Sequence, residues 1–163
     1  MEHIAAADNA NWIIGPFLGS NIAYALCGMY LMKRFRTFRR SQSGKLVFRP
    51  TKISMLGVWV CISGLVSLVY HYVQALGPHA LAENFCYLDH AVAGSATFYF
   101  TDTLGAPSKM TWVIGVMALV TLVASTPNYA SIHSCWHYLS AATAMRWAHD
   151  GFKRLPRFGT KSK

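Results

Sequence analysis

The sequence predicts an all-α integral membrane protein, because it holds few charges, several long apolar segments and a one-sided set of basic residues. Of its 163 residues, 53% are hydrophobic and only 13% are charged, and the mean hydropathy is +0.28. Soluble domains average about 25% charged residues. The low charge content therefore favours a membrane protein over a soluble helical protein, and the length suits a single domain, 1–163.

Five apolar segments predict a bundle of about five transmembrane helices. A helix needs about 20 residues to cross the hydrocarbon core, which the first two segments provide. The third and fourth segments are shorter, so we expect them to pack inside the bundle or to extend into flanking loops. Glycine and proline pairs typical of turns separate the later segments. The expected helices cover roughly 12–32, 53–76, 85–101, 110–126 and 129–148.

The 15 lysines and arginines gather on one side of this expected topology. Eight lie in the loop 33–52 and five in the tail 149–163, and only Lys109 and Arg146 lie elsewhere. Because basic loops stay in the cytoplasm, we expect the N-terminus outside and the C-terminus inside. The net charge of +9 then predicts binding to anionic lipid headgroups rather than to nucleic acid.

Polar side chains occur near the outer ends of three expected helices. Ionisable side chains are costly inside a membrane and mark functional sites by default. Residues four apart on a helix share one face. Ser67 and His71 have this spacing, and so do His133 and His137. We therefore expect one cluster made of Ser67, His71, Asp89, His133 and His137.

Three imidazoles and one water form the open tetrahedral site of a catalytic zinc ion. His71, His133 and His137 are the candidate metal ligands. Zinc lowers the pKa of its bound water to about 7. Asp89 is the candidate residue to orient this water or to accept its proton, and Ser67 is the candidate donor to a developing oxyanion.

Two other interpretations of the histidines stay open. They could form a hydrogen-bonded core network, or His71 could supply one axial ligand of a haem and His133 or His137 the other. Haem would give Ser67 and Asp89 no evident role. His90 follows Asp89 and would point about 100 degrees away from it on a helix, so we expect His90 to be structural.

The motifs that contain these residues resemble those of the CREST superfamily of membrane hydrolases. The stretches "SLVYH" at 67–71, "FCYLD" at 85–89 and "IHSCWH" at 132–137 are similar to the three motifs of that group. The group includes alkaline ceramidases, the adiponectin-receptor family and the Per1-type lipid-remodelling proteins. The branch that this chain resembles most contains myomaker and the post-GPI-attachment phospholipase, through "HSCWH" and the helix within 105–123.

The resemblance implies a role for each site residue. In the family, a serine and a histidine lie on the second helix, an aspartate on the third and two histidines on the last. These roles fall on Ser67, His71, Asp89, His133 and His137. The family has seven spans, so this chain looks like a shortened form without the fifth and sixth helices, in which the last helix keeps its orientation.

We therefore expect a zinc-dependent hydrolase that cleaves an amide or ester bond of a membrane lipid on the lumenal, extracellular or periplasmic side. One alternative is a non-catalytic member of the same fold that remodels membranes or serves a larger complex. The other is a haem-binding electron-transfer subunit. Besides the lipid, another chain in a homo- or hetero-oligomer is an expected partner. A disulfide between Cys86 and Cys135 is a further alternative.

Overall fold

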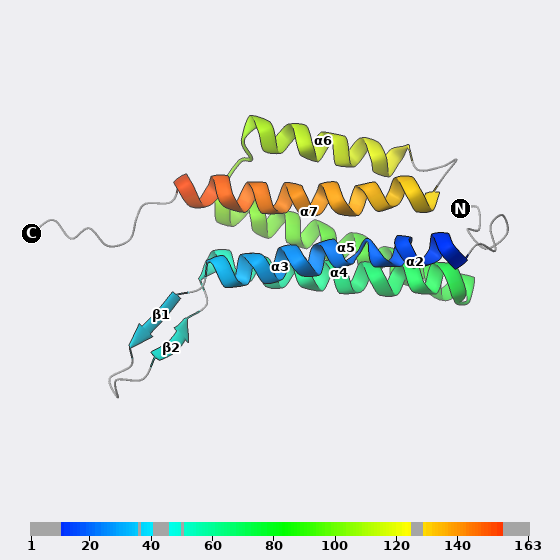
Figure 1. The fold of residues 1–163 in the computed structure, drawn as a ribbon, viewed down its shortest axis with the longest axis horizontal. Helices are drawn as coiled ribbons and strands as arrows, with labels where there is room; N and C mark the ends of the chain where they lie inside the picture. Colours follow the sequence, from blue (N-terminus) through cyan, green and yellow to red (C-terminus); the bar gives the residue numbers. More distant parts are fainter. Residues whose placement is uncertain (1–10, 36, 41–45, 50, 125–128, 155–163) are drawn as a thin grey trace, which may run out of the picture.

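The computed structural model describes residues 11–35, 37–40, 46–49, 51–124 and 129–154. Within these residues, the chain forms six helices and one two-stranded hairpin, and the helices lie alongside one another with nearly common axes (Figure 1). The elements are α2 (Asn11–Gly19), α3 (Ile22–Arg34), β1 (Thr37–Arg40), β2 (Leu46–Arg49), α4 (Lys52–Leu76), α5 (His79–Leu104), α6 (Lys109–Val123) and α7 (Tyr129–Arg154). The helical fold agrees with the prediction.

The first apolar segment is two helices, which corrects the single helix expected at 12–32. α2 ends at Gly19 and α3 begins at Ile22. Pro16 lies inside α2 and has no backbone N–H to donate. At the break, the Ser20 hydroxyl donates a hydrogen bond to the carbonyl oxygen of Phe17 at 2.6 Å.

The basic loop expected at 33–52 contains an antiparallel hairpin. Strands β1 and β2 pair with Phe38 opposite Phe48. The hairpin projects from one end of the helical bundle (Figure 1). Directly after it, the Thr51 hydroxyl accepts a hydrogen bond from the backbone N–H of Ser54 at 3.0 Å and donates one to the carbonyl oxygen of Phe35 at 2.8 Å. Thr51 therefore begins α4 and joins it to the end of α3.

The later helices differ from the expected ranges mainly at their ends. α5 covers 79–104 rather than 85–101, so only the two-residue turn Gly77-Pro78 separates it from α4. α7 continues to Arg154, which makes the first part of the expected tail 149–163 helical. Residues 155–163 and the last residues expected in the fourth helix, 125–126, lie outside the described residues.

Two glycines set the close packing of α3 against α4. A Cβ atom on Gly28 would lie 2.5 Å from the carbonyl oxygen of Gly57, and one on Gly57 would lie 2.5 Å from the carbonyl oxygen of Gly28. Only residues without a side chain allow two helix backbones to approach so closely. Beside this contact lies an apolar core of Cys27, Leu31, Phe35, Ile53, Leu56, Val60, Phe100, Leu104, Ala141, Trp147 and Ala148.

Several helix ends meet at the end of the bundle that carries the hairpin. The rings of Phe35 and Phe152 lie 4.7 Å apart, which joins the ends of α3 and α7. The Trp147 indole N–H donates to the carbonyl oxygen of Gly105 at 3.0 Å, which joins α7 to the turn between α5 and α6. We call this the basic end, because its exposed cations are Lys33, Arg34, Lys52, Lys109, Arg146, Lys153 and Arg154. The opposite end, where α4 finishes and α7 begins, is the histidine end (Figure 1).

Among the described residues, only α4 is both long and apolar enough to cross a membrane. Its most apolar window has a mean hydropathy of 2.0. α6 is apolar as well but has 15 residues, and α2 and α3 are each shortened by the break between them. Length and composition therefore identify one candidate membrane helix among the described residues, and the five expected spans stay a prediction.

Candidate metal centre

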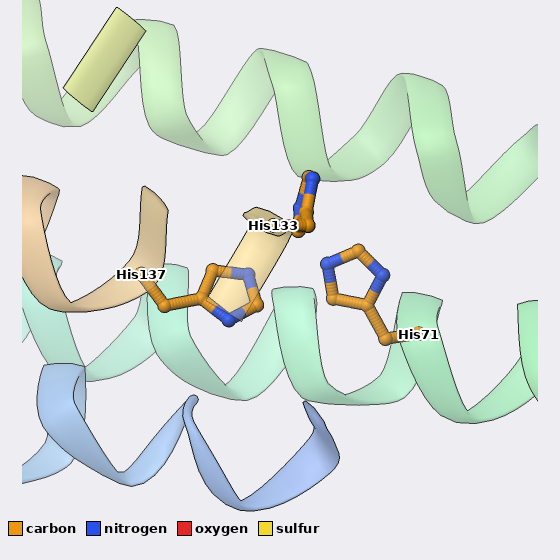
Figure 2. Close-up of side chains that lie close together, drawn as sticks. All are labelled: His71, His133 and His137. Carbon is orange, nitrogen blue, oxygen red and sulfur yellow. The ribbon is translucent and has the colours of Figure 1, made fainter. Parts of the chain in front are cut away.

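Three buried histidines face one another at the histidine end. His71 comes from α4, and His133 and His137 come from successive turns of α7, where a spacing of four residues places both on one face. One ring nitrogen of each histidine lies within 4.8 Å of the corresponding nitrogens of the other two. Figure 2 shows the three rings gathered in one place between their helices. They lie close enough to bind a metal ion, as predicted.

Each of the three rings also holds one buried nitrogen without a hydrogen-bond partner among the described residues. These atoms are Nε2 of His71, Nδ1 of His133 and Nε2 of His137. An unpaired polar atom inside a protein costs about 1–3 kcal/mol, and such atoms are rare. Three of them at one place do not fit a hydrogen-bonded core network. They fit a set of metal ligands.

The second nitrogen has a partner in two of the rings. His71 Nδ1 lies 3.0 Å from Oε1 of Gln74, and His137 Nδ1 lies 2.6 Å from Oγ of Ser20. Metal-binding histidines commonly use their second nitrogen in this way, because the bond fixes the orientation of the ring. Neither partner was predicted from the sequence. The spacing of three residues from His71 is a signal that could have found Gln74.

Aromatic rings enclose the histidine cluster. Phe17, which is 1% exposed, lies 4.7 Å from the His71 ring and 6.2 Å from the His137 ring. Tyr129 stacks on His133 at 4.7 Å with an angle of 22° between the rings. The rings reduce the access of bulk water to the cluster, which strengthens electrostatic interactions inside it.

The two predicted catalytic residues, Ser67 and Asp89, lie beside each other on neighbouring helices. Ser67 is buried on α4, one turn before His71. Its hydroxyl interacts with the carboxyl group of Asp89, which α5 contributes. Among the described residues, the metal-binding group itself contains no carboxylate. The catalytic roles of Ser67 and Asp89 stay predictions.

The neighbours of Asp89 have simpler surroundings. His90 is exposed, and its Nδ1 lies 2.7 Å from the carbonyl oxygen of Cys86, one turn earlier on α5. Its position outside the histidine cluster agrees with the structural role expected for it. Cys86 and Cys135 are both free thiols, so the structure contains no disulfide between them.

Comparison of the chain with protein-family models, with curated proteins and with solved structures found no match. The resemblance of its three motifs to the CREST superfamily therefore stays a prediction. The three-histidine cluster is described independently of that resemblance, by the positions of its ring nitrogens.

Proposed function

We propose that this protein is a zinc-dependent membrane hydrolase that cleaves an amide or ester bond of a lipid. The observation that carries the proposal is the convergence of three unpaired imidazole nitrogens, from His71, His133 and His137. Three histidines are a ligand set of catalytic zinc sites, which keep a fourth position open. Zinc in such a site supplies a water molecule acidic enough to act as a nucleophile near neutral pH.

The packing of the rings favours a single small ion over haem. Two axial histidines must approach a wide, flat macrocycle from opposite faces. Here the ring centroids of the three histidines lie 4.8–5.1 Å apart, and Phe17 packs against them. A macrocycle has no room between these rings, and a third imidazole would have no axial position. Among small ions, zinc suits a site of three nitrogen ligands.

The proposed reaction uses Asp89 and Ser67 for two different tasks. The Asp89 carboxylate accepts the proton of the attacking water. The Ser67 hydroxyl donates a hydrogen bond to the oxyanion that develops on the substrate carbonyl. The interaction between the two side chains supports a shared location for these tasks. Their resemblance to the serine and aspartate of the CREST motifs supports it as well.

A membrane location is supported by the apolar exterior of the bundle. α6 leaves a long row of large apolar side chains exposed, namely Met110, Trp112, Val113, Val116, Met117, Leu119, Val120 and Val123. A contiguous apolar surface of this kind needs lipid or another protein to cover it. The proposed topology has five membrane-crossing segments, with the basic end in the cytoplasm against anionic headgroups and the histidine end on the opposite side.

The apolar face of α6 also favours a second candidate function. Another chain on that face would make this protein a subunit of a larger membrane complex, in a homo- or hetero-oligomer. This role requires no hydrolysis. It predicts that the protein purified alone binds zinc and cleaves no lipid.

Lipid hydrolysis by the purified protein in detergent tests the proposal, with the zinc content measured for each variant. Asp89→Asn should keep zinc and lose about 10²- to 10⁴-fold in turnover, the usual contribution of a general base. Ser67→Ala should keep zinc and lose less, because it removes one hydrogen bond to the transition state. Asp102→Asn is the matched control, since Asp102 is an exposed acid near the other end of α5. Equal turnover in the wild type and Asp89→Asn would contradict the role of Asp89.

Accessibility of terminal tags in sealed vesicles tests the topology. A tag at the C-terminus should be cytoplasmic, and one at the N-terminus should be on the other side. We expect this result because the lysines and arginines gather on one side of the proposed topology. Both tags on the same side would contradict an odd number of spans.

A further inference from the structure

The Ser20 side chain is fully buried at the break between α2 and α3, where it contacts two groups at once. Its Oγ lies 2.6 Å from the carbonyl oxygen of Phe17 and 2.6 Å from Nδ1 of His137. A carbonyl oxygen can only accept, so the single hydroxyl hydrogen points to Phe17. Toward His137, the Ser20 oxygen must then be the acceptor.

This assignment determines which nitrogen of His137 carries the proton. Because Ser20 accepts, Nδ1 of His137 is the N–H donor, and Nε2 of the neutral ring keeps its lone pair. Nε2 is the His137 nitrogen that has no partner in the structure. His71 repeats the arrangement, because Oε1 of Gln74 is an acceptor beside its Nδ1 and its Nε2 is unpaired. Two independent contacts thus prepare two rings as metal ligands.

We propose that Ser20 is a positioning residue of the metal centre, acting through His137. This inference rests on the proposed metal site and assigns part of it to the N-terminal helices, which carry none of the three ligands. It also assigns a role to the break between α2 and α3, where Ser20 contacts His137. The Phe17 carbonyl oxygen, with its two lone pairs, accepts the Ser20 hydroxyl at 2.6 Å and the Ser20 backbone N–H at 3.3 Å.

Metal affinity of the purified full chain, titrated with Zn²⁺ and with Co²⁺, tests the inference. Ser20→Ala should weaken Zn²⁺ binding by about 10- to 100-fold, the usual effect of losing a partner of a ligating histidine. The visible absorption of bound Co²⁺ should also change, because the His137 ring is free to turn. Ser134→Ala is the matched control, since the Ser134 hydroxyl bonds to the Ala130 carbonyl of its own helix. This control should keep wild-type affinity and the wild-type Co²⁺ spectrum.

A second substitution keeps the inference testable if Ser20→Ala fails to fold. Ser20→Cys is close to Ser20 in size, and its thiol is a weak hydrogen-bonding group, so it should weaken Zn²⁺ binding in the same direction. Wild-type affinity and an unchanged Co²⁺ spectrum in both Ser20 variants would overturn the inference while leaving the zinc site standing. A wild-type protein that binds neither metal would instead overturn the proposed function, and this inference with it.

Discussion

The polar side chains at the two ends of α7 differ in how fully they are hydrogen-bonded. At the basic end, Oδ2 of Asp150 accepts hydrogen bonds from Ser108 at 2.6 Å, Thr111 at 3.3 Å and Arg146 at 3.0 Å. At the histidine end, His133 and His137 each keep a buried nitrogen that has no partner in the part of the chain that the structure describes. Both ends place two polar residues four apart on the same helix. The spacing alone therefore does not distinguish a structural pair from a ligand set.

Partners from other helices make the difference. α6 supplies Thr111 and its N-cap Ser108 to the acid on α7, so the Asp150 cluster is complete within the protein. α4 supplies His71 and its partner Gln74 to the histidine end, and Nε2 of His71 has no partner among the described residues either. A polar network that is fully satisfied stabilises a fold, and one that is partly satisfied is costly. The contrast between the two ends thus supports the proposed metal site at the histidine end.

The largest expected effect that separates the two ends is stabilisation by zinc. An ion that binds only the folded protein adds about 4 kcal/mol of stability at a free concentration 1,000 times its Kd. The wild type should show a large rise in thermal midpoint when zinc replaces chelator, and His137→Ala should lose it. Asp150→Asn should keep the full rise, because Asp150 belongs to the other end. Thermal unfolding in detergent measures all three proteins. A zinc response in His137→Ala equal to that of the wild type would contradict zinc binding at the histidine end.

A smaller effect concerns the protein without metal. His133→Leu removes an unpaired buried nitrogen and nearly keeps the volume of the side chain. We expect this variant to be at least as stable as the wild type in chelator, by up to about 1–2 kcal/mol, because an unsatisfied polar atom is lost. In zinc the order should reverse, since only the wild type gains the ion. Denaturant unfolding with and without zinc measures the reversal, and destabilisation of the variant under both conditions would show that His133 is a structural residue.

Periodicity explains why the histidines could be predicted from the sequence. The four-residue spacing of His133 and His137 places them on one face of any helix, and alternation of the helices brings His71 to the same depth. Ser20 could not be found in this way. Its contact with His137 joins residues 117 positions apart. The contact also depends on the break between α2 and α3, whereas the sequence predicted one continuous helix there.

The ends of the helices were the other part that the sequence did not predict. Gly77-Pro78 indicates a turn, but only the structure shows that α5 begins directly after it. The hairpin was missed because the basic residues of 33–52 dominate its composition, and a two-stranded ribbon leaves a weak pattern in so short a segment. Charge placement predicted which elements share an end and could not predict their backbone conformation.

The next effect is a pH dependence at the basic end. The hydrogen bond from the Ser108 hydroxyl, followed by the contact with Arg146, holds the pKa of Asp150 below its ordinary value. A lowered folded-state pKa stabilises the protein above the unfolded-state pKa of about 3.9, and this contribution is lost as the pH falls through the folded-state pKa. Asp150→Asn should therefore lower the thermal midpoint at pH 7, and the two proteins should converge at more acidic pH. A difference that stays constant down to acidic pH would exclude the ionised carboxylate as its source.

The smallest expected effect compares two donors to the same carboxylate. Ser108 bonds to Asp150 and also accepts the backbone N–H of Thr111 at 3.2 Å as the N-cap of α6. Ser108→Ala should therefore cost about 1 kcal/mol through the cap alone. Arg146→Gln should cost only about 0.3–0.5 kcal/mol, because the Arg146 side chain is 49% exposed and its ion pair spans one turn of a single helix. Unfolding at low and high salt measures both, and only the Arg146 effect should shrink as salt screens the pair. A larger loss from Arg146→Gln than from Ser108→Ala would show that charge, rather than hydrogen bonding between helices, holds the basic end together.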